Sequence, residues 1–154
     1  HLWNALVLLQ TRGVALRAVS PLYETEPWGL AAQPRFLNAA CAAETDLEPL
    51  ALLDTLKAIE RALGRVPTVR NGPRTLDLDL LFYGDAVIDL PGLTVPHPRI
   101  AERGFVLRPL HDLAPALRHP RTGATVADMV AAWADVTAEA DVAVRPLGVD
   151  VGAA

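Results

Sequence analysis

The stretch NGPRTLDLDLLFYG, residues 71–84, carries the clearest structural signal in the sequence. Leucine and aspartate alternate within it, a pattern that predicts a strand over residues 74–84. Because side chains two positions apart share a face of a strand, Asp77 and Asp79 are expected on one side. The opposite side then holds three leucines, Leu76, Leu78 and Leu80. Two neighbouring carboxylates repel each other and are costly to desolvate, so we expect a cation beside them.

The compensating cation is either a metal ion or an arginine. Same-face neighbours on a strand are about 6.6 Å apart at the backbone, so both carboxylates can converge on cations about 3.5–4 Å apart. Such hard oxygen ligands suit Mg²⁺, which typically uses one or two carboxylates together with substrate phosphates. Arg74, directly after the rigid Gly72-Pro73 turn, either pairs with an aspartate or clamps a phosphate. The alternative is a surface strand with two solvated acids.

The rest of the chain predicts helices and strands in irregular order. Helical spacing of apolar residues predicts helices over residues 1–10, 46–64 and 125–136, with a short one at 99–104. Strands are predicted over residues 14–20, 35–45 and 86–89, with an added edge strand at 140–151. Proline and glycine mark loops at 23–34, 65–73 and 90–99. Antiparallel strands beside scattered helices predict an α+β fold rather than a doubly wound sheet.

Capping patterns support two of these helices. Thr45 and Glu48 form a capping-box pattern, and Pro49 is allowed in the first turn that follows. Thr125 and Asp128 form the corresponding cap of the last helix. Gly13 and Gly64 are expected to end the first and second helices, and the core face of the last helix is expected to hold Val126, Met129, Val130 and Trp133.

Length and composition exclude several classes of protein. At 154 residues the chain is long enough for one domain with its own core. We find no apolar run long enough to span a bilayer, so no membrane association is expected. The single cysteine, Cys41, excludes an intramolecular disulfide and a cysteine-built metal site, which fits a reducing, cytosolic setting.

The charge distribution favours a small anionic ligand. The net charge of −4 argues against a nucleic-acid binder with a general basic surface. All but one of the 14 cationic residues are arginine, the exception being Lys57. Half of them fall in one stretch that also holds His97, namely Arg61, Arg65, Arg70, Arg74, Arg99, Arg103 and Arg108. This local cluster in an acidic protein suits a small anion better than a polyanion.

His97 lies between two prolines and is followed by Arg99 and Arg103. A lone histidine is more often structural or solvated, but the fixed backbone and the nearby arginines favour a phosphate-contacting donor. The sequence contains no P-loop, no G-x-G-x-x-G and no nucleophile elbow. A bound nucleotide would therefore be held by arginines, histidine and metal.

Taken together, these motifs resemble one family. The segment GPRTLDLDLL resembles the signature of the 6-hydroxymethyl-7,8-dihydropterin pyrophosphokinases of folate biosynthesis. VSPLYETEPWG with QPRFLNAA resembles the family's pterin-side segment, and LTVPHPRIAERGFVLRPLHDLAP resembles the segment after the signature. The resemblance covers residues 14–120 in matching order. It implies a three-layer α/β/α sandwich around a mainly antiparallel, ferredoxin-like sheet, in a cytoplasmic and monomeric enzyme.

The resemblance also implies a reaction and a site. The family transfers the β,γ-pyrophosphoryl group of ATP to the pterin hydroxymethyl and releases AMP. Asp77 and Asp79 would bind two Mg²⁺ ions that bridge the triphosphate. The implied phosphate contacts are Arg74, His97 and Arg103 with Thr94 nearby, and the implied closing loop holds Arg65 and Arg70. The implied pterin contacts are stacking by Phe36 and Phe105 and edge recognition by Asn38 and the Thr25 loop.

The chain departs from the family pattern in several places. Phe36 replaces a frequent tyrosine, Asn71 a frequent tryptophan, Pro67 a frequent arginine and Pro98 a common tyrosine. Family members also open with a strand and a glycine-rich turn. We therefore expect a single pterin pyrophosphokinase domain over residues 1–154 that lacks the family's first N-terminal strand.

Two alternatives remain open at this stage. A non-catalytic ATP- or pterin-binding module would bind nucleotide with Mg²⁺ and release no AMP. A metal-dependent phosphoesterase could use the same aspartate pair, although the lack of further acidic or histidine ligands near Asp77 and Asp79 argues against it.

Overall fold

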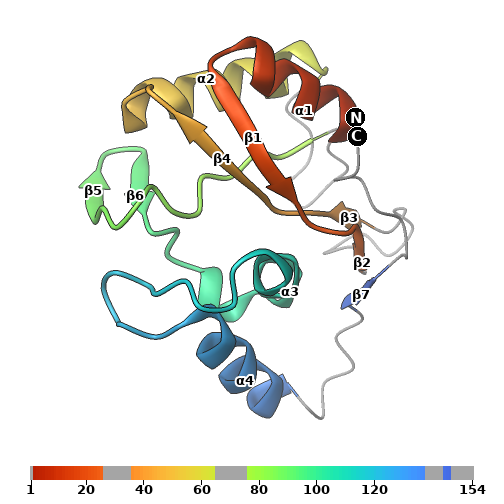
Figure 1. Cartoon of the computed structure of the whole chain (residues 1–154), viewed down its shortest axis with the longest axis vertical. Coiled ribbons are helices and arrows are strands. Elements are labelled where there is room, and N and C mark those ends of the chain that lie inside the picture. Colours follow the sequence, from red (N-terminus) through yellow and green to blue (C-terminus); the bar gives the residue numbers. More distant parts are fainter. Residues whose placement is uncertain (1, 26–35, 65–75, 138–143, 147–154) are drawn as a thin grey trace.

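The computed structural model describes residues 2–25, 36–64, 76–137 and 144–146 (Figure 1). The helices are α1 (Leu2–Thr11), α2 (Pro49–Ala62), the 3-10 turn η1 (Ile100–Glu102), α3 (Gly104–Leu113) and α4 (Val126–Thr137). The strands are β1 (Val14–Val19), β2 (Tyr23–Thr25), β3 (Phe36–Asn38), β4 (Cys41–Thr45), β5 (Ile88–Leu90), β6 (Leu93–Val95) and β7 (Val144–Pro146).

Every strand pairing in the described residues is antiparallel. β1 pairs with β4, β5 pairs with β6, and β2 lies between β3 and β7. The predicted α+β class with antiparallel strands is therefore confirmed. The predicted edge strand at 140–151 is confirmed for Val144–Pro146, where β7 pairs along β2.

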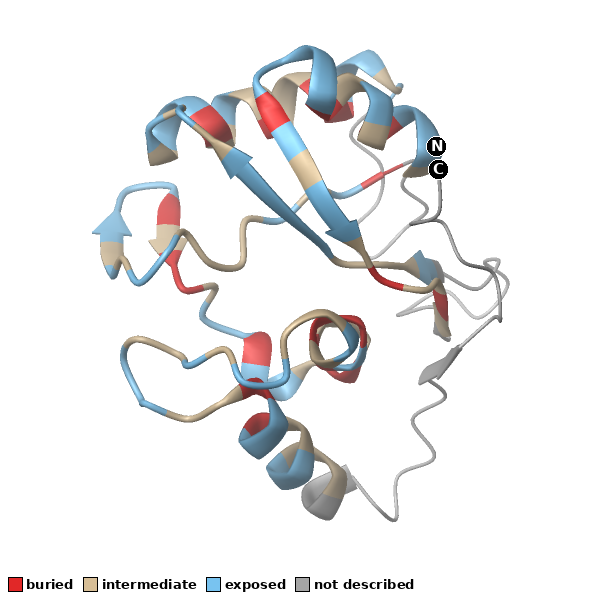
Figure 2. Ribbon diagram, in the orientation of Figure 1, coloured by how far each residue is buried: buried red, intermediate tan, exposed pale blue. Residues whose placement is uncertain are grey.

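Two hydrophobic cores lie on either side of the β1–β4 pair. Figure 1 shows α1 and α2 together above this pair, and α3 and α4 below it. The upper core centres on Ile59 of α2 and Leu9 of α1, and the lower core on Leu107 of α3 and Val126 of α4. These four residues are buried, whereas β1 and β4 are largely exposed (Figure 2). Each pair of helices thus has its own apolar contact.

Residues 76–83 connect the two cores but do not form the predicted strand. Within the described residues they join no β-ladder. Their backbone is bonded differently: the Leu78 N–H donates to the Glu60 carboxylate, and the Leu81 carbonyl accepts the N–H of His97. The predicted assignment of faces nevertheless holds. Leu76 is buried with Leu78 and Leu80 packed beside it, while Asp77 and Asp79 are exposed.

The predicted continuous strand over residues 35–45 is wrong. β3 and β4 belong to different sheets and are separated at Ala39–Ala40. At this break, Ala40 is joined by two hydrogen bonds to Ser20, which directly follows β1. The buried Ser20 donates its N–H to the Ala40 carbonyl (2.8 Å), and Ser20 Oγ accepts the N–H of Ala40 (2.9 Å). Both chain segments therefore leave the first sheet at one point and enter the second.

The segment after residue 90 is more regular than predicted. Residues 93–95 form β6 instead of a loop, paired with β5 around Gly92, whose φ of +82° favours glycine. The short helix predicted at 99–104 is the 3-10 turn η1. Helix α3 was not predicted, because Pro109 inside it removes a backbone donor. Burial of Leu107 and Leu110 in the lower core offsets that loss.

The capping predictions had mixed outcomes. At α4, Thr125 and Asp128 exchange hydrogen bonds in both directions at 3.0 Å, so the capping box is confirmed. At α2 it is wrong: Glu48 makes no side-chain cap, and Thr45 Oγ1 donates to the Gly13 carbonyl instead. Pro49 does begin α2. Gly13 and Gly64 follow α1 and α2 with positive φ, as predicted.

No helix in the described ranges is both long enough and apolar enough to cross a bilayer.

We expect Gly104→Ala to destabilise the protein by about 1–3 kcal/mol, the usual cost of overpacking. A Cβ at residue 104 would overlap the Trp133 ring, which packs on the start of α3. Urea unfolding of both proteins measures the change. In a double variant with Trp133→Leu the cost should largely disappear. An unchanged midpoint for Gly104→Ala alone would show that the indole does not hold this position.

Candidate functional site

The aspartate pair lies on the exposed side of a segment whose other side is buried. Leu76 is 6% exposed and belongs to the upper core, whereas Asp77 and Asp79 are exposed. No group of three or more histidine, cysteine or acidic side chains that could hold a metal occurs in the described ranges. Within the described residues, the ligands available for a metal here are the two hard carboxylates of Asp77 and Asp79. This donor set fits Mg²⁺ that shares its remaining ligands with phosphates and water.

The backbone beneath this pair is held by a buried carboxylate. Glu60, from the last turns of α2, is 2% exposed, and its Oε1 accepts the Leu78 N–H at 2.7 Å. Lys57 Nζ lies 3.5 Å from the same oxygen. Sequence reasoning missed Glu60. A signal was available, because it follows Leu56 by four positions and so lies on the apolar face of an amphipathic helix.

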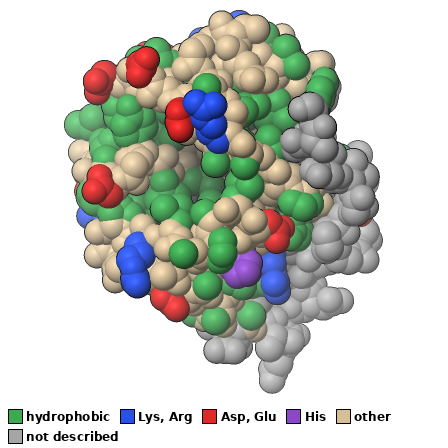
Figure 3. Space-filling model, in the orientation of Figure 1, with side chains coloured by type: hydrophobic (Ala, Val, Ile, Leu, Met, Phe, Trp, Pro, Cys, Tyr) green, Lys and Arg blue, Asp and Glu red, His purple; other side chains and the backbone are tan. Residues whose placement is uncertain are grey.

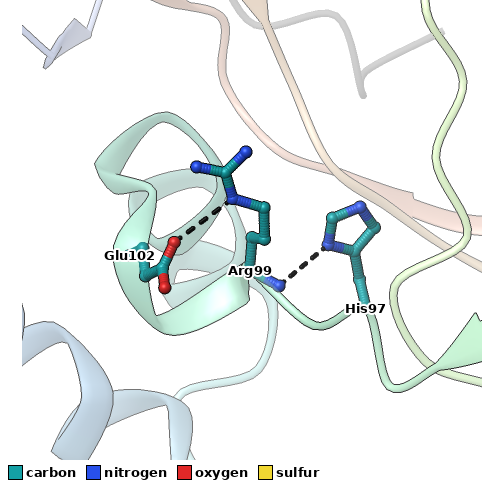
Figure 4. A network of polar contacts seen from close by, with 3 residues as sticks. All are labelled: His97, Arg99 and Glu102. Atoms are coloured by element: carbon teal, nitrogen blue, oxygen red, sulfur yellow. Dashed lines mark hydrogen bonds and ion pairs between the residues drawn. The ribbon is translucent and has the colours of Figure 1, made fainter.

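His97 is anchored to the same segment from the other side. Its backbone N–H donates to the Leu81 carbonyl (2.9 Å), and its Nδ1 accepts the Arg99 N–H (3.2 Å). Figure 4 shows the ring and this bond. With Nδ1 as the acceptor, the neutral ring carries its proton on Nε2, which is then a donor.

The charges around His97 come from the residues that the sequence singled out. Burial lowers the pKa of His97 below its ordinary value; Asp79 opposes that shift, and the positive charges of Arg103 and Arg99 add to it. The predicted metal ligand and the predicted phosphate contacts therefore act on one histidine. Arg99 also forms an exposed ion pair with Glu102, Nε to Oε2 at 3.2 Å (Figure 4).

Arg103 links this group to the predicted pterin residues. Its guanidinium carbon lies 5.5 Å from the centre of the Phe105 ring, in a cation–π contact. Both residues are half-buried and flank the start of α3. Arg108, another member of the arginine cluster, faces elsewhere and lies over the Trp133 ring at 5.5 Å. Of the described members of the arginine cluster, Arg103 thus lies beside Phe105 and Arg108 at the α3–α4 contact.

The pterin-side strand lies next to α3. β3 contacts α3, and Asn38 is half-buried opposite Tyr23 of β2. The Tyr23 hydroxyl donates to the Asp112 carboxylate of α3, which ties β2 to that helix. Burial first, and then this hydrogen bond, raises the pKa of Tyr23 to about 12. This tether holds the helix of Phe105 beside the strand of Asn38.

The structure describes the other predicted site residues only in part. Thr25 and Phe36 face each other as a backbone pair between β2 and β3, and their side chains lie outside the described part. Thr94 is half-buried on β6 opposite Asp89, three residues before His97. The predictions for Arg65, Arg70 and Arg74, and the departures at Pro67 and Asn71, all fall outside the described residues.

The surface of this face is mixed in charge. In Figure 3 the basic side chains stand singly among acidic and hydrophobic ones, so the described residues of this face form no broad basic patch. Hydrophobic side chains border a hollow near the centre, between the upper and lower halves of the molecule. Such a surface suits a small ligand with an apolar part better than a polyanion.

Comparisons with known proteins identify relatives. The family described as 7,8-dihydro-6-hydroxymethylpterin-pyrophosphokinase (HPPK) matches residues 1–115. A 2-amino-4-hydroxy-6-hydroxymethyldihydropteridine pyrophosphokinase of Pseudomonas aeruginosa is 58% identical over 105 residues, which cover 68% of this chain and 65% of that protein. One of the same name from Synechocystis is 41% identical over 118 residues, covering 77% of this chain and 60% of the relative. The folic acid synthesis protein fol1 of Pneumocystis carinii is 44% identical over 124 residues, 80% of this chain and 17% of that protein. The chain thus spans less than two thirds of the length of each of these relatives.

We predict that His97 makes stability depend on pH. Its folded pKa is lowered, so the unfolded state binds more protons below about pH 6.5 and the contribution of the neutral ring is lost as the pH falls. Protonation at Nδ1 would also break the bond from Arg99. The urea midpoint should therefore fall more between about pH 7.5 and about pH 5.5 in the natural protein than in His97→Gln.

His119, whose pKa is also lowered by burial, is present in both proteins and serves as the internal control. Equal pH slopes in the two proteins would contradict the assignment of a neutral, bonded ring to His97.

Proposed function

The chain belongs to the 7,8-dihydro-6-hydroxymethylpterin-pyrophosphokinase family, and on that premise we propose that it is an ATP-dependent pyrophosphokinase of folate biosynthesis. It transfers the β,γ-pyrophosphoryl group of ATP to the hydroxymethyl group of 6-hydroxymethyl-7,8-dihydropterin and releases AMP. The observation that carries the proposal is the exposed Asp77–Asp79 pair, with a backbone hydrogen bond from Leu78 to Glu60 between the two and with Asp79 close enough to His97 to oppose the lowering of its pKa.

Asp77 and Asp79 would hold two Mg²⁺ ions at this site. Their carboxylates share the exposed side of the segment, and oxygen ligands in this number suit Mg²⁺ shared with a triphosphate. When bound, the ions neutralise the charge of the triphosphate between the attacking hydroxyl and the leaving AMP. The chain's own part is to hold the two carboxylates in place, which Leu78 and Glu60 do through the backbone.

The phosphate groups are bound by cationic and neutral donors. The Nε2–H of His97 donates to a phosphate oxygen, and the Arg103 guanidinium binds another in a charge-assisted contact. Arg74 and Thr94 complete this set. Burial lowers the pKa of His97, which favours the neutral ring, and the bond from the Arg99 N–H to Nδ1 leaves Nε2–H as the donor. Arg65 and Arg70 belong to the loop that closes over the bound substrates.

The pterin lies beside the phosphates, against Phe105. An aromatic ring offers a bicyclic ligand an offset stacking surface, and Phe36 supplies the opposite one. Asn38 recognises the pterin edge, because its amide can both donate and accept, with the backbone near Thr25. The contact between Arg103 and Phe105 supports this arrangement, since it places a phosphate-binding cation next to the stacking ring.

The arrangement of the elements supports a single domain over residues 1–154. We propose that it is a three-layer sandwich, with α1 and α2 on one side and α3 and α4 on the other side of antiparallel strands. We propose a cytoplasmic monomer that needs neither membrane nor nucleic acid for its reaction.

Asp79→Ala should lower the rate of pterin-dependent AMP formation by at least about 10²-fold, the loss typical when one group that stabilises developing charge is removed. Nucleotides from a reaction with ATP, Mg²⁺ and the dihydropterin are resolved by chromatography. The matched control is Asp85→Ala, an exposed carboxylate in the turn after the same segment, which should leave the rate unchanged.

Near-normal AMP formation by Asp79→Ala would contradict the metal assignment. Mg²⁺-dependent binding of ATP by the natural protein with no AMP release would instead contradict the proposed activity and indicate a binding module.

A further inference from the structure

We propose that Glu60 is a positioning residue, which fixes the direction of the Asp77 and Asp79 carboxylates through the backbone between them. The inference rests on the proposed function, because its metal-binding readout needs the proposed Mg²⁺ site at Asp77 and Asp79 and its activity readout needs the proposed reaction. Glu60 is 2% exposed and comes from α2, a different element from the aspartates. Its Oε1 accepts the N–H of Leu78, the residue between the two. A buried carboxylate placed at that one amide is the observation from which the inference starts.

The bond acts on the geometry of both aspartates. The Leu78 N–H belongs to the peptide plane that joins residue 77 to residue 78, so holding this N–H fixes the orientation of that plane. Residues 76–83 form no β-ladder in the described part of the chain, so sheet pairing there does not set this orientation. The Leu78 side chain packs toward the upper core, which leaves the flanking side chains on the exposed face. One buried bond therefore directs two exposed carboxylates.

A second bond holds the far end of the segment to the same helix. The Tyr83 hydroxyl donates to the Leu47 carbonyl, just before α2, at 2.6 Å. Along a helix, the path from Leu47 to Glu60 is about 20 Å. An extended chain from Leu78 to Tyr83 covers about 17 Å. Because these two lengths are similar, an extended segment can make the Leu78–Glu60 and Tyr83–Leu47 bonds at once. Helix α2 therefore fixes both ends of the segment.

The chemistry of residue 60 suits this task. A carboxylate accepts hydrogen bonds and donates none, and a bond from an N–H to it is stronger than one to a neutral carbonyl. A carboxylate buried to this extent is costly unless it is paired. Lys57 lies one turn earlier, 3.5 Å from the same oxygen, and reaches solvent with 43% of its side chain exposed. Lys57 thus provides a cationic partner for the carboxylate oxygen that also accepts the Leu78 N–H.

The test separates positioning from stability. Glu60→Met keeps the volume and removes the acceptor, whereas Glu60→Gln keeps an oxygen that can accept the Leu78 N–H. For Glu60→Met we expect weaker Mg²⁺ binding by about 10–100-fold, the usual cost of losing an outer-shell partner of a metal ligand. Glu60→Gln should restore most of that affinity. Mn²⁺ binding in the presence of a non-hydrolysable ATP analogue, followed by water-proton relaxation, measures this without turnover.

Ile59→Val is the matched control for stability. Ile59 is fully buried in the same turn of α2, and its truncation costs about 0.5–1.5 kcal/mol without touching the Leu78 bond. It should leave the Mn²⁺ affinity and the Mg²⁺ concentration for half-maximal AMP formation unchanged. Unfolding by urea shows which variants are folded under the assay conditions.

Each outcome decides the inference. Weakened metal binding in Glu60→Met, rescued by Glu60→Gln and absent in Ile59→Val, supports it. Unchanged metal binding in folded Glu60→Met overturns it and leaves Glu60 a purely structural residue. If Glu60→Met does not fold, Glu60→Gln decides: metal binding as weak as in Asp79→Ala overturns the inference, because the acceptor is still present. A natural protein that binds Mn²⁺ and nucleotide but forms no AMP contradicts the proposed function and still permits this comparison.

Discussion

The hydrogen bond from the Leu78 N–H to the buried Glu60 carboxylate is the contact on which the site depends. It is made between two exposed aspartates and anchors their backbone from the side that faces the core. Repulsion between neighbouring carboxylates would otherwise favour conformations that separate them. The bond to Glu60 and the packing of Leu76 oppose this separation. The free energy of folding therefore keeps two like-charged carboxylates close together, where they can bind a cation. Preorganisation of this kind is how a rigid element contributes to electrostatic catalysis.

The remaining groups are brought to that pair by a short stretch of chain with little regular structure. From β6 the chain passes through His97 and Arg103 to Phe105 in the first turn of α3; His97 accepts a hydrogen bond from the Arg99 N–H, and Arg103 lies over the Phe105 ring. The His97 N–H donates to the Leu81 carbonyl, so the proposed phosphate contact is joined directly to the segment of the proposed metal ligands. The protein carries a net charge of −4, but Arg99 and Arg103 supply individual positive charges beside His97.

Sequence reasoning succeeded where the physical cause is local. The alternation correctly predicted that Asp77 and Asp79 share a face opposite the leucines, and the Thr125 cap needs no partner outside its own helix. It failed where residues distant in the sequence determine the local structure. Whether residues 76–83 pair in a β-ladder depends on the chain segments beside them. Here the Leu78 N–H is bonded to Glu60, and the Leu81 carbonyl is bonded to the N–H of His97. Helix α3 escaped prediction because its stability comes from the lower core, against the local effect of Pro109.

The most direct test of the account is the fate of the β-phosphate. The purified protein is supplied with ATP labelled at that position, Mg²⁺ and 6-hydroxymethyl-7,8-dihydropterin, and the label is located by chromatography. The account predicts that the label moves to the pterin and that the AMP released is unlabelled. Label appearing in ADP would show transfer of the γ-phosphoryl group alone, and label remaining in bound ATP would show binding without transfer. Either result would contradict a pyrophosphokinase site at Asp77 and Asp79.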